Sequence, residues 1–197
     1  MKIIVLILGT LASSFSFGAD WGKIGESSNR QYFYDVNSVK RTGKYQYEFW
    51  EKHIGKKNTD VIRSRVDCND DSYTILDAYI YQGDDVLDSS INQEYRLIPP
   101  PDTVAYLTLE RVCNYGVAAE VEKFNLPKKS SYTDDLDFQV ARFNAFGFKD
   151  YIPTESMMNE YFSLMDEANK EEKLYKKFIK VLDGVYSLKI KYLDLKQ

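Results

Sequence analysis

The chain has 197 residues, and its 26 Lys+Arg against 30 Asp+Glu give a formal net charge of −4. A hydrophobic fraction of 44% argues against intrinsic disorder, and the length suits one domain, with or without an appendage, around a sizeable core. The slight acidic excess argues against nucleic acid as the main partner, because binding phosphate requires a basic face.

The first 19 residues are predicted to be a secretory signal peptide. Lys2 supplies a charged start, and residues 3–17 are apolar but interrupted by small polar residues. This stretch is shorter than the roughly 20 residues of a membrane span. Cleavage after Gly18 and cleavage after Ala19 both fit, and a buried N-terminal strand is the alternative interpretation. We therefore expect export to the periplasm or cell surface, or secretion, with no transmembrane segment in the mature chain.

Cys68 and Cys113 are the only two cysteines, so the mature chain would carry no N-terminal lipid anchor. In an oxidising compartment such an even pair predicts one disulfide. Closing a loop of about 45 residues stabilises a fold by roughly 4 kcal/mol in the chain-entropy model. Because the C-x-x-C spacing of redox proteins is absent, we interpret the bridge as structural.

Residues 20–98 have the pattern of an antiparallel β-sheet. Alternating and β-branched or aromatic residues predict strands at Gln31–Tyr34, Lys44–Ile54, Val61–Val66, Tyr73–Tyr81 and Tyr95–Ile98. The turn at Gly83-Asp84-Asp85 and the spacing of about ten residues between turns favour a meander over βαβ units.

A helix is predicted after Pro99-Pro100-Pro101, with Asp102 as its N-cap. Leu109, Val112 and Cys113 recur on one face at helical spacing, so a bond to Cys68 would staple this helix onto the sheet. An extended recognition segment is the alternative for the three prolines.

Residues 115–197 are predicted to be a mainly helical extension. One helix runs from a Thr133 cap to Phe146 with Gly147 as its stop, and another opens at Pro153-Thr154 and continues to Leu182. Helix and strand fit residues 185–195 equally well. The predicted fold class is α+β: residues 20–114 form an antiparallel sheet with a disulfide-stapled helix, and the helical extension packs on it.

Charge is unevenly distributed along the chain. Residues 40–65 hold eight basic and three acidic residues, whereas residues 67–110 hold one basic and ten acidic residues. A two-faced surface for a charged partner is one interpretation. The favoured alternative is that neighbouring strands pair Arg63 or Arg65 with acids such as Asp77, so that the fields cancel.

Catalytic and metal-binding motifs are weak. His53 lies in a Lys-rich segment that we interpret as an exposed turn, and no nucleophile motif such as G-x-S-x-G accompanies it. Asp67-x-Asn69-x-Asp71 begins like a calcium loop, but Ser72 and Ala78 replace the required Gly and Glu. We therefore predict a non-catalytic protein with no cofactor and no metal ion.

The tyrosines are the candidate binding residues. Tyr79 and Tyr81 share a face of their strand, as do Tyr32 with Tyr34 and Tyr45 with Tyr47. Tyrosine offers a large amphipathic contact area at low entropic cost, so these six are candidates for a protein-binding face. Ordinary filling of the strands is the alternative.

Residues 20–114 resemble the surface-adhesin E family of Gram-negative bacteria. The resemblance rests on the order of short motifs, namely Trp21, Ile24-Gly25-Glu26-Ser27, Tyr34-Asp35, Ser38-Val39, Arg41, Phe49-Trp50, Val66-Asp67-Cys68, Tyr81, Gly83, Pro99-Pro100-Pro101 and Val112-Cys113. It implies an antiparallel sheet with a packed helix, export, and binding to host matrix or plasma proteins. The missing anchor cysteine and the segment after Cys113 depart from the family pattern, and no ligand-contacting residue is carried over.

Two functions follow as hypotheses. The first is an exported, adhesin-like protein that binds other proteins. The second is a soluble periplasmic protein that binds and neutralises or chaperones another protein through the acidic segment and the C-terminal helices.

Overall fold

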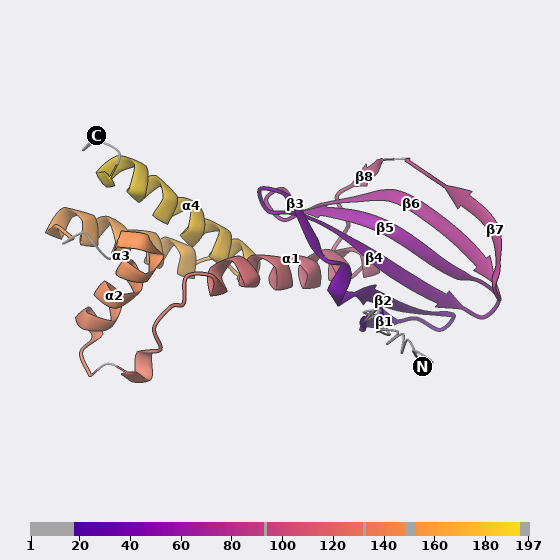
Figure 1. Cartoon of the computed structure of the whole chain (residues 1–197), viewed down its shortest axis with the longest axis horizontal. Coiled ribbons are helices and arrows are strands. Elements are labelled where there is room, and N and C mark those ends of the chain that lie inside the picture. Colours follow the sequence, from indigo (N-terminus) through magenta and orange to yellow (C-terminus); the bar gives the residue numbers. More distant parts are fainter. Residues whose placement is uncertain (1–17, 93, 132, 149–152, 194–197) are drawn as a thin grey trace, which may run out of the picture.

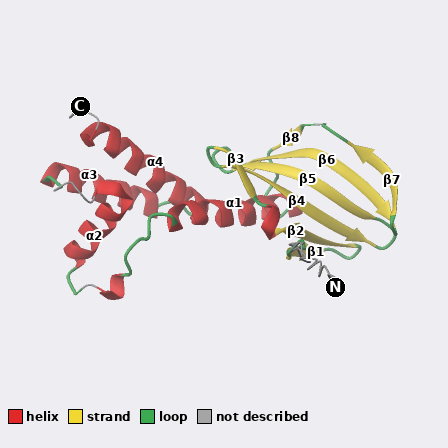
Figure 2. Ribbon diagram, in the orientation of Figure 1, coloured by secondary structure: helices red, strands yellow, loops and turns green. Residues whose placement is uncertain are grey.

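The protein consists of a curved β-sheet at one end and a group of helices at the other (Figure 1). The computed structural model describes residues 18–92, 94–131, 133–148 and 153–193. Helix α1, Val104–Glu122, runs from the sheet into the group of helices and so belongs to both parts (Figure 2). It therefore continues past residue 114, the predicted end of the first domain.

The sheet is antiparallel and has eight strands, which confirms the predicted fold class. Its path is β1-β2-β4-β5-β6-β7, with β3 paired to β4 and β8 paired to β6. The strands are β1 Trp21–Glu26, β2 Arg30–Asp35, β3 Lys40–Gly43, β4 Gln46–Gly55, β5 Thr59–Asp67, β6 Ser72–Gln82, β7 Asp85–Ser90 and β8 Tyr95–Leu97. The segment from β4 to β7 is a meander, as expected.

The two faces of the sheet differ in how well they are covered. In β4, Tyr47, Phe49 and Glu51 are buried, while Glu48 and Trp50 point to the opposite face and stay partly exposed. This alternation is the two-residue period of a strand. The buried residues pack against α1, and their side of the sheet is called the covered face. The opposite side is called the uncovered face.

Helix α1 begins one residue later than predicted. The hydroxyl of Thr103 accepts a hydrogen bond from the Tyr106 amide at 3.2 Å and is the N-cap. Asp102, the expected cap, has φ +64° and lies in the turn before the helix. Both side chains are acceptors of the type that caps helices, so composition alone does not distinguish them.

The predicted disulfide between Cys68 and Cys113 is confirmed. The two Cα atoms are 5.6 Å apart, and both side chains are completely buried. Leu109, Val112 and Val117 lie on the same buried face of α1. The bond therefore joins the end of β5 to the side of α1 that packs on the sheet.

Three α-helices follow α1 in the described part of the C-terminal half, and together they are called the helical lobe. They are α2 Asp135–Phe143, which continues as a π-helical turn over Asn144–Phe148, α3 Glu155–Asn169 and α4 Leu174–Leu193. No helix in the described residues is long and apolar enough to cross a membrane.

The boundaries of these helices correct several expectations. Asp134, and not Thr133, caps α2, because its carboxylate accepts from two backbone amides. Gly147 has φ +96° and breaks the helical backbone, as predicted for a stop. The single helix expected between Pro153 and Leu182 is two, α3 and α4. Residues 185–193 are helical, and residues 194–195 lie outside the described part of the chain.

Two hydrophobic clusters hold the protein together. The first joins sheet, α1 and α4 through Tyr45, Tyr47, Phe49, Val66, Tyr73, Leu109, Val112, Val117, Tyr175 and Ile179, around the disulfide. The second fills the helical lobe and contains Phe143, Phe146, Phe148, Met157, Met158, Tyr161, Ala168, Val181, Val185 and Leu188. Helix α4 contributes to both, so it links the lobe to the sheet.

Candidate functional site: the uncovered face of the sheet

The uncovered face carries regular rows of side chains that cross the strands. Lys52 of β4 lies opposite Val61 of β5, which lies opposite Tyr79 of β6. The next row contains Trp50 opposite Arg63. Because facing residues in a sheet lie side by side, these rows form one continuous surface.

An aromatic patch occupies this surface. Trp21, Trp50, Val61, Tyr79 and Tyr81, called the aromatic patch below, line a shallow hollow of about 400 Å³ together with Asp35. The rings of Trp50 and Tyr79 are 6.3 Å apart between centroids and tilted by 34°. The patch thus brings together both tryptophans of the chain and two of the predicted tyrosines.

A cation lies within the aromatic patch. The ammonium of Lys52 sits 4.1 Å from the centre of the Trp21 ring, within the range of a cation–π contact. Trp21 comes from β1 and Lys52 from β4, and β2 lies between the two strands. The contact therefore spans three strands and favours this position of the indole ring.

A network of ion pairs borders the aromatic patch. Arg63 bonds Asp77 at 2.6 Å and Glu48 at 3.4 Å, and Arg65 bonds Glu48 at 3.0 Å. The backbone amide of Asn92 and then the Arg63 guanidinium hold the pKa of Asp77 below its usual range, against the effect of burial. The expected pairing of Arg63 with Asp77 is confirmed, so this part of the face is neutral.

The other predicted tyrosines do not lie on this face. Tyr32 and Tyr34 point to the covered face, opposite His53 and Glu51 in β4. They are partly buried there, and only Tyr79 and Tyr81 of the six reach the aromatic patch.

Tyr45 and Tyr47 belong to the core, which corrects their assignment to a binding face. Tyr45 is 6% exposed and its hydroxyl donates to Asp183 of α4 at 2.5 Å, while Tyr47 is 2% exposed against Gly116 of α1. Burial raises the pKa of Tyr47 to about 12. Strand alternation predicts which residues share a face but does not predict which face a helix covers.

His53 lies in strand β4 and not in an exposed turn, so this interpretation was wrong. Its imidazole Nε2 is 3.2 Å from Glu51, whose carboxylate is buried and also accepts hydrogen bonds from Ser64 and Tyr73. Burial and then the charge of Glu51 raise the pKa of Tyr73 well above its usual range, which keeps its hydroxyl a donor. Since Ser64 and Glu51 are fully buried, the hydrogen bonds of this cluster satisfy a buried carboxylate.

The acidic side chains that follow β5 are paired with basic and polar side chains of the same chain. Asp71 accepts hydrogen bonds from Lys173 at 2.8 Å and Tyr175 at 2.9 Å, and Lys176 lies 2.9 Å away. Burial opposes ionisation of Asp71, but these donors prevail and lower its pKa. Asp70 pairs with Arg96. Within the described ranges, no group of three or more His, Cys, Asp or Glu is placed to hold a metal ion.

Sequence reasoning overlooked both tryptophans as site residues. Trp50 alternates with Tyr47 and Phe49, so it had to lie on the face opposite to theirs. Once Phe49 is assigned to the core, this alternation predicts that Trp50 lies on the uncovered face. The position of Trp21 on the uncovered face depends on the register between β1 and β2, and no pattern in the sequence predicts that register.

Comparison with known proteins gives no match: no family model, no curated protein and no solved structure corresponds to this chain.

Proposed function

We propose that the chain is an exported, non-catalytic protein that binds a partner protein through the aromatic patch. The observation that supports this proposal best is the gathering of Trp21, Trp50, Tyr79 and Tyr81 on a sheet face that the helices leave uncovered. Tryptophan and tyrosine are the residues most enriched at the energetic centres of protein interfaces.

The surroundings of the aromatic patch suit a protein partner. Its rim includes paired charges, Arg63 with Asp77 and Arg65 with Glu48, and the Asp35 carboxylate, so the patch presents apolar rings beside a polar border. Protein interfaces commonly have such an apolar centre and polar rim. The buried disulfide supports an oxidising compartment. The resemblance to surface-adhesin E makes matrix and plasma proteins the proposed partner class.

Binding of the oxidised mature chain to individually immobilised matrix and plasma proteins tests this proposal. We expect saturable binding by the unchanged protein, and a loss of affinity of about tenfold or more in Trp50→Ala/Tyr79→Ala. Tyr186→Ala is the matched control, because Tyr186 is an exposed tyrosine on α4 that does not belong to the aromatic patch. Absence of saturable binding, or equal affinities in all three proteins, would contradict the proposal.

A second candidate function is favoured by the edge strand β7. Val86 and Leu87 are more than half exposed there, and Asp84, Asp85 and Asp88 give the edge a negative charge. An open edge with these properties suits an extended basic segment that adds as a further strand. This is the interaction expected of a periplasmic protein that binds and protects another chain.

The two functions predict different sensitive residues. Leu87→Lys should abolish partner binding if β7 is the interface and should leave it unchanged if the aromatic patch is. Trp50→Ala/Tyr79→Ala should leave partner binding unchanged if β7 is the interface and should weaken it if the aromatic patch is the interface.

A further inference from the structure

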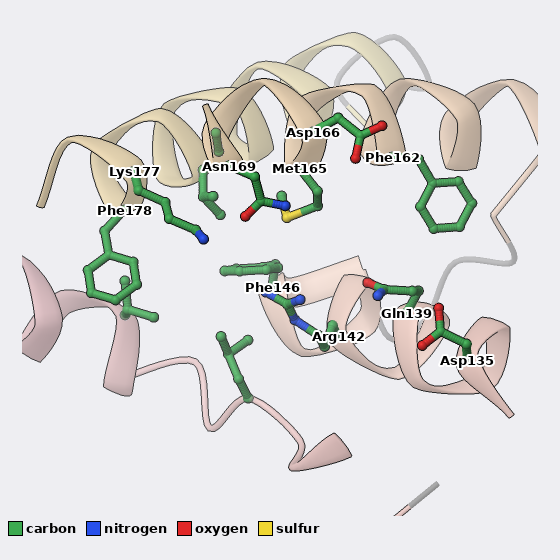
Figure 3. Close-up of a pocket in the computed structure, with 14 residues that line it drawn as sticks. Asp135, Gln139, Arg142, Phe146, Phe162, Met165, Asp166, Asn169, Lys177 and Phe178 are labelled. Carbon is green, nitrogen blue, oxygen red and sulfur yellow. The ribbon is translucent and has the colours of Figure 1, made fainter. Parts of the chain in front are cut away.

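The helical lobe contains a pocket of about 440 Å³ (Figure 3). This volume falls in the usual range of small-molecule sites, about 300–1,000 Å³. Helix α2 forms one wall, and α3 and α4 form the other (Figure 3). Val121 of α1 and Leu126 of the following segment complete the lining.

About half of the lining surface is apolar. Phe146 and Ala168 are fully buried, and Val181 is nearly so. Phe162, Met165 and Phe178 are partly exposed. The pocket thus offers an apolar surface that a hydrocarbon chain can cover.

Two cations reach this pocket from opposite walls. Arg142 extends from α2, and Lys177 extends from α4 toward the same space, with the Asn169 amide beside them (Figure 3). In the described part of the chain no carboxylate forms an ion pair with either cation, although Lys176, Lys180 and Lys191 of α4 are paired. A guanidinium and an ammonium that face one space favour a carboxylate between them.

Two carboxylates also line the pocket, and among the described residues neither forms an ion pair with Arg142 or Lys177. Asp135 is bonded to Lys129 at 2.6 Å. Asp166 lies on the Phe162 side of the pocket, away from Lys177 (Figure 3). Gln139 also lines the pocket, and its buried Oε1 atom has no hydrogen-bond partner among the described residues.

We propose that this pocket binds a small amphiphile that consists of a carboxylate head and an unbranched apolar chain. The head lies between Arg142 and Lys177, where Asn169 adds a hydrogen-bond donor. The chain lies along Phe146 and extends toward Phe162 (Figure 3). This site is separate from the aromatic patch and does not depend on the proposed function.

Calorimetry of the oxidised mature chain with sodium decanoate, below its micelle concentration, tests the proposal. We expect saturable one-to-one binding that Arg142→Gln/Lys177→Gln weakens at least tenfold. Lys180→Gln is the matched control, because Lys180 lies on the same helix and pairs with Glu171 outside the pocket lining. Its affinity should stay within twofold of the unchanged protein. No binding of decanoate, or equal binding by the double variant, would overturn the proposal.

Two further ligand comparisons separate a built site from unspecific adsorption. Affinity should rise from octanoate to decanoate, by at most about fourfold per added methylene. Decyltrimethylammonium, with the same chain and the opposite charge, should bind at least tenfold more weakly than decanoate. Equal binding of the two decyl compounds, or no dependence on chain length, would contradict the site.

Two controls keep these results interpretable. Circular dichroism and the unfolding midpoint should be the same for all variants, and decanoate should raise the midpoint of the unchanged protein more than that of the double variant. Equal midpoint increases in both proteins would contradict the site. Trp50→Ala/Tyr79→Ala should bind decanoate with unchanged affinity, so a failure of the aromatic patch and a failure of the pocket are distinguishable.

Discussion

The ammonium of Lys52 lies 4.1 Å from the centre of the Trp21 indole ring, on the face of the sheet that the helices leave uncovered. Trp21 belongs to the first strand, and the contact holds its ring beside Trp50, Tyr79 and Tyr81. The cation–π contact favours this orientation of the indole and so preorganises the ring for a partner. Preorganisation reduces the entropy lost on binding.

The contact between Lys52 and Trp21 should be measurable as a coupling energy. In a double-mutant cycle of Lys52→Gln and Trp21→Ala, we expect a coupling of about 0.5–1 kcal/mol in the free energy of unfolding. Urea unfolding of the four proteins gives this value. Strictly additive effects would show that the ammonium does not interact with the ring.

Removal of the disulfide should lower stability without changing the fold. Cys68→Ala/Cys113→Ala should lose about 2–5 kcal/mol of unfolding free energy, since the bond restrains the unfolded chain and joins β5 to α1. Leu109, Val112 and Val117 still pack on the sheet, so the far-UV spectrum should remain. An unchanged urea midpoint would contradict a stabilising role.

The buried carboxylate of Glu51 should make its donors costly to remove. Tyr73→Phe deletes the hydroxyl that donates to Glu51 and should destabilise the protein by about 1.5–3 kcal/mol. Tyr186→Phe, at an exposed tyrosine, is the control and should have no effect. Equal unfolding free energies for the two variants would mean that Glu51 does not require this donor.

Asp71 should make stability depend on pH in the acid range. Its pKa is lowered in the folded protein, so its contribution is complete above the unfolded-state pKa of about 3.9. The contribution disappears as the pH falls below this value and through the lower folded-state pKa. Asp71→Asn should therefore be less stable than the unchanged protein, by about 1–3 kcal/mol at neutral pH.

The difference in unfolding free energy between Asp71→Asn and the unchanged protein should stay constant down to about pH 4 and become smaller below it. Thermal unfolding at closely spaced pH values measures this dependence. Asp84→Asn, in the exposed turn between β6 and β7, is the control. A difference that persists undiminished at the lowest pH would contradict the role of the charge.

The sequence predicted much of the architecture because its local patterns agree with the final structure. The alternation in Tyr73–Tyr81 and the pair of cysteines led to the meander and to the staple between β5 and α1. The break between α3 and α4 escaped prediction, since Lys170 to Lys173 contain neither glycine nor proline and the apolar stripe continues across them. The chain breaks between α3 and α4 because α4 packs against both hydrophobic clusters.

The site was only partly predictable for a related reason. Tyr79 with Tyr81, and Tyr45 with Tyr47, have the same two-residue spacing, yet the first pair lies on the uncovered face and the second beneath α1. Burial depends on where α1 docks, and spacing carries no information on that. His53 escaped for another reason: β4 continues to Gly55, where it pairs with Arg30, so the lysines around His53 do not mark a turn.

Site-specific photocrosslinking in cells tests the central claim most directly. The photoreactive residue p-benzoylphenylalanine replaces Tyr79 in the aromatic patch or Tyr186 on α4 of the full chain. The proposed function predicts a discrete crosslinked adduct with a partner protein from position 79 and none from position 186. No adduct at position 79, or the same adducts from both positions, would contradict binding through the uncovered face of the sheet.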